Sequence, residues 1–575
     1  MGNDYAKKNK NNKPAYRFDV TTIAVSTFLL LALLVCTIVM SDTLVNGLVN
    51  AKAFIIKYFG CFFILFVASM LIYNLWLAFS KYGSIRLGRV KPQYSTFGWV
   101  AMIFCAAMGT SILFWSAIEW AYYIVWLQPM GMGPEETANF SVAYSFFHWG
   151  IPAWSVYATG VVPIAYRYYV RQKEGLTLQG GCEGVLGDKA HGPWGTVINI
   201  IFIFSILGGL TISYGTGIPM LANVAHVLLG VPENFVTFAV LVIAITAMFT
   251  WSACSGIAKG IQILSKLCIY MALALVVYFL LFGNTLFEIE NTVQSLGLSF
   301  QNFVQMLFYV DPTRASGGFP QEWTVFYWAW WLGLAPVMWI FIAKCSAGRS
   351  IRSVVGTVIL AGTAGSVIFF GAISNHGLGE ILLSSFDWAN LGANGTFLDS
   401  FYNTFNEYNL VSDVLATLPL SKMVTAIWFL VGFILLVTTM DSAAFTMGAA
   451  CTKGLRTWQD PPVTIRIFWA FALSVCPLCL LWSGSSLSGF QAVLIITALP
   501  TSVVILLCIL SCSKWLKEDF GHMTRQEIQE YFMLDDEMEE YQRRRQQTEK
   551  LVKGVITDFS DEEEKPSEDK TAFEK

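Results

Sequence analysis

Tryptophan and tyrosine gather in two apolar segments that lie far apart in the sequence. One cluster lies between His148 and Tyr157, and the other lies between Trp323 and Trp331. Tryptophan in a membrane span is usually found near the membrane interface. Several indole rings in the middle of two spans therefore predict a box of aromatic faces, although packing explains each tryptophan taken alone. Such a box would bind a quaternary ammonium group, which forms no good hydrogen bonds but is attracted to aromatic faces.

No arrangement of side chains in the sequence indicates catalysis. The chain has no recognisable catalytic triad, phosphate-binding loop or metal-ligand spacing, and the glycines at Gly208 lack a phosphate-binding context. We therefore expect a protein that is not an enzyme and has no cofactor. Glu119, His148 and Asp441 are titratable groups within apolar segments, which suggests function, but a structural role explains each of them equally well.

The composition is that of a membrane protein. Of the 575 residues, 55% are hydrophobic and 13% are charged, whereas a soluble domain carries about 25% charged residues. Apolar stretches recur that are long enough to cross ~30 Å of hydrocarbon, which takes about 20 helical residues. We predict twelve spans, at about residues 18–41, 53–80, 95–127, 138–169, 194–228, 234–253, 260–283, 321–346, 353–374, 423–452, 464–483 and 488–512.

Basic residues are concentrated in alternate connections between these spans. They precede the first span and follow spans two, four, six, eight and ten, whereas the other connections are acidic or poor in lysine and arginine. Under the positive-inside rule this alternation places both termini in the cytoplasm and requires an even number of spans. We predict a multi-pass protein of a bacterial-type cytoplasmic membrane.

The spans group into two blocks of five. From the N-terminus we predict a basic cytoplasmic tail (1–17), two extra transmembrane helices (18–94), a first block of five spans (95–290), a linker with an amphipathic surface helix (291–320), a second block of five spans (321–512) and a charged cytoplasmic tail (513–575). The surface helix, at about residues 299–309, is too short to span. Equal blocks of five suggest an inverted repeat with a binding site near the midplane.

Four segments carry a resemblance to a known family. They are Gly317–Trp331 (GGFPQEWTVFYWAWW), Phe341–Arg352 (FIAKCSAGRSIR), Phe147–Trp154 (FHWGIPAW) and Thr438–Ser442 (TTMDS). On these segments the chain resembles the betaine/choline/carnitine transporter family, over roughly residues 15–515.

The resemblance implies a fold and a set of site residues. The fold is an all-α polytopic membrane protein of twelve transmembrane helices, with a LeuT-type core of two inverted five-helix repeats preceded by two extra helices, and commonly a homotrimer. By position, the residues that would line the central box are Trp149, Trp154, Tyr157, Trp330 and Trp331. Tyr122 matches a tyrosine of the carnitine branch, and Trp323 would lie on the outer path.

Two departures from the family pattern bear on the substrate. The choline-selective branch has an aspartate where this chain has Ser111. A cationic alcohol would gain from that carboxylate, so its absence favours zwitterions such as glycine betaine or carnitine. Many members have a further tryptophan where this chain has Leu334, which affects the expected inner gate and the fit of the substrate.

The resemblance supports two different predictions about whether transport is coupled to sodium. Thr438 and Thr439 match a pair of hydroxyls that bind sodium in coupled members, with backbone carbonyls of Cys105, Met108 and Leu435 completing the site. Hard oxygen ligands suit such an ion, although adjacent threonines in a helix also bond to their own backbone.

The sodium-independent carnitine branch has an arginine at the position of Cys268, which cannot replace the ion. Met338, however, coincides with a methionine that replaces sodium in that same branch, and Lys266 would face elsewhere. We favour sodium coupling over sodium-independent exchange.

The sequence therefore predicts a secondary transporter of a quaternary-ammonium zwitterion that works by alternating access. The expected partners are the substrate, a sodium ion and the lipid bilayer, and not nucleic acid. The alternatives are a sodium-independent substrate/product antiporter of carnitine or betaine compounds and a ligand-binding osmosensor or channel.

Overall fold

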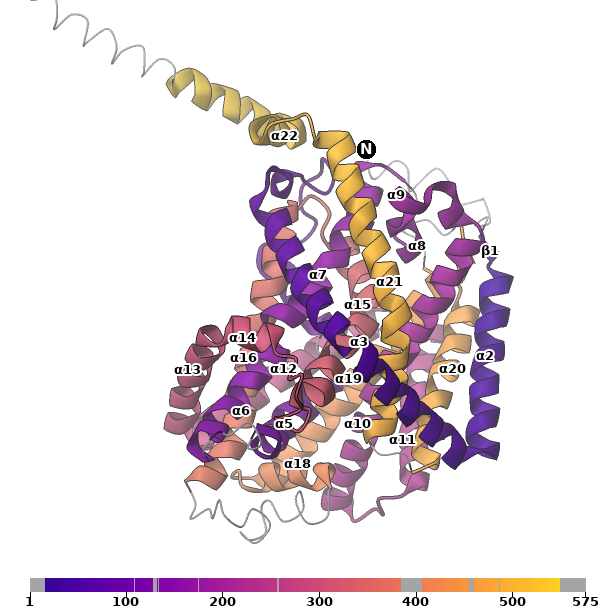
Figure 1. The fold of residues 1–575 in the computed structure, drawn as a ribbon, viewed down its shortest axis with the longest axis vertical. Coiled ribbons are helices and arrows are strands. Elements are labelled where there is room, and N and C mark those ends of the chain that lie inside the picture. Colours follow the sequence, from indigo (N-terminus) through magenta and orange to yellow (C-terminus); the bar gives the residue numbers. More distant parts are fainter. Residues whose placement is uncertain are drawn as a thin grey trace, which may run out of the picture.

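The chain folds into a bundle of long helices (Figure 1). The computed structural model describes residues 16–107, 109–127, 132, 134–173, 175–255, 258–383, 406–454, 460–484 and 487–548. The helices of the first half are α2 (Val20–Val39), α3 (Ser41–Phe79), α4 (Thr96–Ala107), α5 (Thr110–Leu127), α6 (Pro134–His148), α7 (Ile151–Ala165), α8 (Leu178–Gly181), α9 (Glu183–Leu186), α10 (Pro193–Leu229), α11 (Phe235–Ser255) and α12 (Ala258–Phe282).

The second half continues the bundle. Its helices are α13 (Thr285–Gln301), α14 (Phe303–Phe308), α15 (Val325–Cys345), α16 (Ile351–Leu382), α18 (Glu407–Ala416), α19 (Ser421–Ala450), α20 (Val463–Trp482), α21 (Leu487–Phe520) and α22 (Arg525–Phe532). Shorter elements are the 3-10 helices η1 (Lys81–Ser84) and η4 (Gly187–His191), the π-helices η3 (Tyr166–Val170) and η5 (Pro320–Thr324), and the strands β1 (Arg17–Phe18) and β2 (Thr452–Lys453), which pair antiparallel.

The helices confirm an all-α polytopic membrane protein. In the described part of the chain, eight helices are long and apolar enough to cross a membrane, or nine if the bent pair α12 and α13 is counted as one span. The remaining predicted spans fall on helices that are broken or shorter, at α4 with α5, α6 with α7, and α11. The total of twelve and the inverted repeat stay predictions.

Two predicted spans are interrupted near their middle. Residue 109 separates α4 from α5, and Trp149 and Gly150 separate α6 from α7. A Cβ atom on Gly150 would lie 2.2 Å from the carbonyl oxygen of Phe146, so only glycine fits this break. Pro152 lies in the first turn of α7, where its missing N–H is not needed. The second break sets the direction of α7, which carries part of the predicted aromatic cluster.

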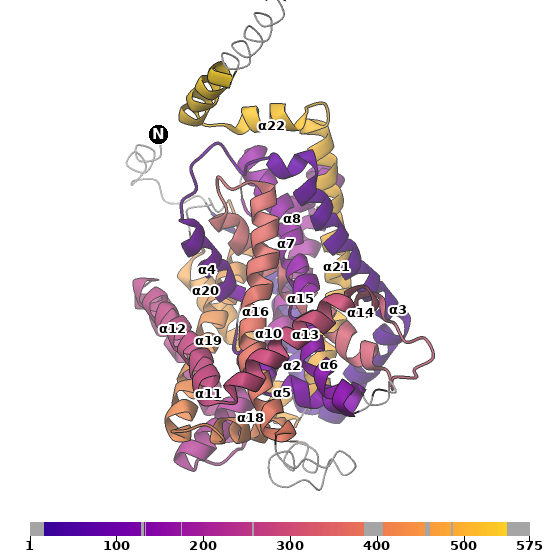
Figure 2. The same ribbon diagram turned by 90° about the vertical axis from the view of Figure 1, so that its left-hand side faces the viewer.

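The surface helix differs from the prediction. The chain bends by 109° between α12 and α13, and α13 runs across the bundle in Figure 2. The predicted domain boundary at residue 290 falls inside α13, and the predicted surface helix covers the last residues of α13 and all of α14. We missed α13 because its buried face is polar and its exposed face is apolar, as Ile289 and Val293 are more than half exposed.

Polar contacts fix α13 to α16 along its length. Asn284 donates to Glu380 at 2.7 Å, the Nδ1 atom of His376 lies 3.2 Å from a carboxylate oxygen of Glu288, and Asn291 donates to Asn375 at 2.7 Å. A Cβ on Gly283, at the bend, would lie 2.2 Å from Glu288 Oε1. The first half of α13 is therefore anchored to α16 by hydrogen bonds between polar side chains.

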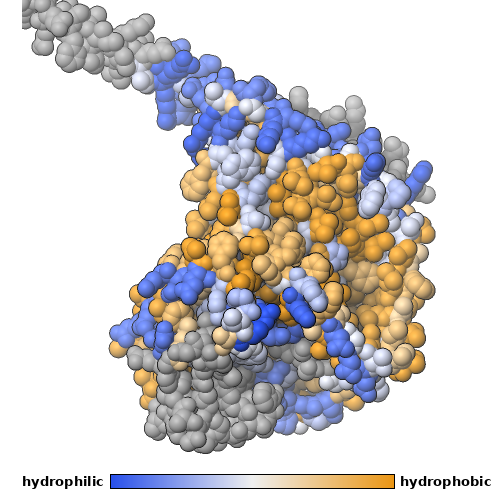
Figure 3. Space-filling model, viewed as in Figure 1, coloured by the Kyte–Doolittle hydropathy of each residue, from blue (hydrophilic) through white to orange (hydrophobic). Residues whose placement is uncertain are grey.

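Charged side chains gather at one end of the molecule. Figure 3 shows this hydrophilic end above a broad apolar band. Here the connection before α4 meets the connection before α16, because Leu87 N–H donates to the Arg349 carbonyl and Gly348 N–H to the Leu87 carbonyl, both at 2.8 Å. Two connections that the charge pattern assigned to the same side thus lie together, and β1 and α22 lie towards the same end (Figure 1).

Candidate aromatic binding site

The two predicted aromatic clusters meet in the fold. Helices α7 and α15 pack against each other, and Trp149, at the break before α7, lies between two indoles of α15. Its ring centroid is 5.4 Å from that of Trp330 and 5.5 Å from that of Trp331, with interplanar angles of 86° and 84°. These edge-to-face contacts bring residues from the two predicted blocks of five spans into one cluster.

The other two predicted residues complete the group. Tyr157 lies 4.9 Å from Trp331 and 5.7 Å from Trp154, and Trp154 lies 6.1 Å from Trp331, all between ring centroids. We call these five residues, Trp149, Trp154, Tyr157, Trp330 and Trp331, the aromatic box. Each is at most 5% exposed, so the box is buried within the bundle.

Close packing and hydrogen bonds hold the indoles in place. Trp154 packs on Gly362 of α16, where an added Cβ would lie 1.9 Å from its ring, and its Nε1 donates to Ser366 at 3.2 Å. Trp331 Nε1 donates to the carbonyl of His148 at 3.0 Å. The Nε1–H of Trp330 has no hydrogen-bond partner among the described residues, so it remains available to a polar group on a ligand.

A carboxylate lies directly behind the box. Glu119, on α5, accepts a hydrogen bond from Trp149 Nε1 at 2.9 Å and another from the hydroxyl of Tyr327 on α15. One oxygen atom of Glu119 thereby connects α5, α15 and the break between α6 and α7. His148, the second titratable group noted in the sequence, lies between the hydroxyls of Tyr123 and Thr324, at 2.6 and 3.0 Å.

The two predicted outer residues contact each other, and a third aromatic ring connects them to the box. Tyr122 and Trp323 have ring centroids 4.9 Å apart. Trp115 lies two helical turns before Tyr122 on α5. Its ring centroid is 5.9 Å from that of Trp323 and 6.3 Å from that of Trp330. The sequence analysis missed Trp115, although its spacing of seven residues from Tyr122 places both on one helix face.

One of the two predicted ion-binding threonines, Thr439, lies at the break between α4 and α5. Thr438 and Thr439 donate to the carbonyl of Leu435 at 3.0 and 2.7 Å, so each bonds to its own helix backbone. A Cβ on Gly109 would lie 3.5 Å from the Thr439 hydroxyl. Cys105 lies on α4, but Met108 lies outside the described residues. A hydroxyl that donates to a carbonyl retains oxygen lone pairs that could bind a cation.

The predicted selectivity and coupling residues are spread over several helix contacts. Ser111 donates to Ser213 of α10 at 3.3 Å, and Cys268 contacts the carbonyl of Val431 at 3.6 Å. Leu334 packs on Gly209, where an added Cβ would lie 2.4 Å from its side chain, and Met338 is buried on α15. Lys266 is exposed, as its position predicts. None of these contacts joins Cys268 to the aromatic box.

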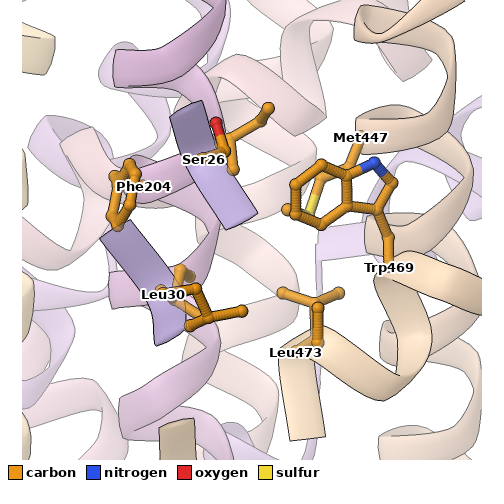
Figure 4. A pocket seen from close by; sticks show the side chains of 9 residues that line it. Ser26, Leu30, Phe204, Met447, Trp469 and Leu473 are labelled. Carbon is orange, nitrogen blue, oxygen red and sulfur yellow. The ribbon is translucent and has the colours of Figure 1, made fainter. Parts of the chain in front are cut away.

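A cavity elsewhere in the bundle is not the binding site. Figure 4 shows it between α2, α10, α19 and α20, with Ser26, Leu30 and Trp469 among its lining residues. It shares no residue with the aromatic box. Its volume of about 10 Å³ has room for no more than a single water molecule.

Comparison with known proteins gives a consistent result. A family model described as the betaine/carnitine/choline family transporter (BCCT) matches residues 21–521. A protein of Escherichia coli (strain K12) named uncharacterized transporter YeaV is 35% identical over 462 residues, which cover 80% of this chain and 93% of that protein.

Two relatives have names that state a substrate. A carnitine transporter of Acinetobacter baumannii is 33% identical over 477 residues, covering 83% of this chain and 84% of that protein. The glycine betaine transporter OpuD of Bacillus subtilis (strain 168) is 32% identical over 502 residues, covering 87% of this chain and 93% of that protein.

Proposed function

Because the chain belongs to the betaine/carnitine/choline family of transporters, we propose that it carries a glycine betaine or carnitine type of zwitterion across the membrane by alternating access. The observation that carries this proposal is the buried aromatic box. Its five rings come from α7, the break before α7 and α15, and the centroids of contacting rings lie 4.9–6.1 Å apart. Each desolvated aromatic face contributes about 0.5–2 kcal/mol to the binding of a cation.

Two features support a zwitterion over a cationic alcohol. Ser111 is neutral and donates to another serine, so it offers no countercharge to a cation. Trp330 offers an indole N–H that has no partner among the described residues. A substrate with its own carboxylate would satisfy such a donor, because hydrogen bonds to a charged acceptor are stronger than neutral ones.

We propose sodium-coupled symport. Thr439 lies against Gly109, in the break between α4 and α5. Irregular backbone inside a membrane protein is tolerated where it lines a cavity, and unwound segments of this kind coordinate ions in transporters. The threonine oxygens and the carbonyl of Leu435 would supply hard ligands for a sodium ion.

The second candidate is sodium-independent exchange of two related betaines. It rests on Met338, which is buried on α15 two turns from the aromatic box, at the position where the exchanging branch has a methionine. The exchange mechanism needs no ion at Thr438 and Thr439, whose bonds to Leu435 are explained by helix geometry alone.

We also propose the membrane arrangement that the charge pattern predicts. The hydrophilic end that contains β1, α22 and the basic connections would face the cytoplasm, with both termini on that side. The apolar exposed face of α13, which includes Ile289 and Val293, would contact neighbouring copies in a homotrimer.

Uptake into proteoliposomes tests the function and its coupling. Labelled glycine betaine and carnitine are supplied with sodium outside, with potassium outside, or with either compound preloaded. Accumulation driven by a sodium gradient would establish symport. Uptake only into preloaded vesicles, unchanged by sodium, would establish exchange, and downhill flux without accumulation or exchange would support a channel.

A further inference from the structure

Glu119 is a carboxylate buried beside the aromatic box. Its side chain is 0% exposed. Both of its hydrogen bonds are made by Oε2, which accepts from Trp149 and from Tyr327. The second oxygen, Oε1, has no hydrogen-bond partner among the described residues. A buried carboxylate with one unsatisfied oxygen is costly unless a positive charge or a proton compensates it.

The groups around Glu119 supply no positive charge. Its polar neighbours are the hydroxyls of Tyr123 on its own helix, Ser145 on α6 and Tyr327 on α15, together with the Trp149 indole. His148 also contacts Tyr123, but its two ring nitrogens face the Tyr123 and Thr324 hydroxyls. A neutral imidazole satisfies both hydroxyls. Among the described residues, therefore, no cation of the protein faces this carboxylate.

A cation bound in the aromatic box would supply the positive charge that the surroundings of Glu119 lack. The indole of Trp149 lies between Glu119 and the other rings, because its N–H points at the carboxylate while its ring lies 5.4 Å from Trp330. Donation of the N–H to a carboxylate makes the indole face more electron-rich. A cation in the box would thus interact with the ring and, across it, with the carboxylate, in a site shielded from water where charges act strongly.

We propose that Glu119 is the counter-charge of the aromatic box, so that a quaternary ammonium in the box and a proton on Glu119 exclude each other. This inference rests on the proposed function, because it requires a cation in the box. It makes Glu119 a specificity-determining residue that selects a charged trimethylammonium head over a neutral group of the same shape. It also orients a zwitterion, whose own carboxylate must point away from Glu119.

The test compares glycine betaine with tert-butylacetate, in which carbon replaces the nitrogen and removes the positive charge. Binding of both compounds to the purified full-length protein is measured by tryptophan fluorescence at neutral pH and at a mildly acidic pH at which the carboxylates of both compounds remain ionised. The variants are Glu119→Gln, whose amide oxygen still accepts from Trp149 and Tyr327, and Glu380→Gln as control. Glu380 accepts from Asn284 on α13 and does not contact the box.

The expected result separates charge from structure. In the native protein, glycine betaine binds more tightly than tert-butylacetate at neutral pH, and the preference shrinks in acid. In Glu119→Gln the affinity for glycine betaine falls by about tenfold, the affinity for tert-butylacetate is unchanged, and the pH dependence disappears. Glu380→Gln behaves as the native protein does.

Two other results have distinct meanings. If the native protein binds glycine betaine but its preference over tert-butylacetate is the same at both pH values, or persists in Glu119→Gln, the inference is overturned while the proposed function stands. If the native protein binds neither glycine betaine nor carnitine, the proposed function fails first. The native pH series decides the matter even if Glu119→Gln does not fold.

Discussion

The guanidinium of Arg86 holds both carboxylate oxygens of Glu537, at 2.8 and 3.0 Å, although the two residues lie 451 positions apart. Arg86 belongs to the connection before α4 and also forms a β-bridge with Ser350, the N-cap of α16. Lys91 forms a second ion pair with Asp536 at 2.7 Å. The C-terminal segment is thus docked, by charge, onto the connection that leads into the broken helix α4.

This docking should depend on pH in a defined direction. Partial burial raises the pKa of the Glu537 carboxyl, but the hydrogen bond and charge of Arg86 outweigh it, so the pKa lies below its ordinary value. The pair therefore stabilises docking at and above the ordinary pKa, and this contribution is lost as the pH falls through the lowered pKa. We expect a C-terminal segment that stays protected from proteolysis at neutral pH and is released in acid.

Arg86→Ala should release the segment at neutral pH as well. Both partners are about a third exposed, so the pair contributes only about 1 kcal/mol or less, and cleavage by a protease should become a few times faster. Arg543→Ala is the control, since among the described residues Arg543 forms its ion pair with Glu539, four positions earlier in an exposed helix. Equal cleavage of native protein and Arg86→Ala would show that other contacts hold the segment.

Trp331→Ala should weaken substrate binding strongly and leave the protein folded. Trp331 contacts three of the other four rings of the box and so contributes a face that no neighbour can replace. Loss of a desolvated cation–π contact of ~2 kcal/mol corresponds to an affinity lower by at least tenfold. Trp251→Ala is the control, because Trp251 is 66% exposed on the outer surface of α11. Unchanged affinity in Trp331→Ala would place the site elsewhere.

Replacing Thr438 and Thr439 by alanine should remove the dependence of uptake on sodium or abolish uptake. The Thr439 hydroxyl lies near the break at Gly109, and Thr438 is its neighbour on α19, so their replacement would remove two of the proposed ligands. Thr446→Ala is the matched control, since Thr446 makes the same kind of bond to Ser442 on the same helix. Uptake that remains driven by a sodium gradient in the double variant would move the ion site away from α19.

The sequence was sufficient to predict that the two aromatic clusters meet, because tryptophan and tyrosine are distinctive residues whose enrichment in two spans has few explanations. It was not sufficient to predict the helix α13, since a helix that buries Glu288 and exposes Ile289 reverses the usual pattern of polarity. Trp115 was missed because α5 is mostly apolar and each of its three tryptophans, taken alone, looks like packing. The role of Glu119 depends on which donors reach it across three helices, and spacing along the chain carries no such information.

Gly362→Ala should disturb the box from behind, through packing alone. A Cβ at this position would lie 1.9 Å from Cδ2 of Trp154, an indole that cannot move aside without losing its bond to Ser366 and its contact with Trp331. Overpacking of this kind costs about 1–3 kcal/mol, so both the thermal stability in detergent and the affinity for glycine betaine should fall. Gly356→Ala, on the same helix, is the matched control, because an added Cβ there meets no atom within 4 Å. If the two variants bind and unfold alike, Trp154 tolerates displacement and its contact with Gly362 does not define the box.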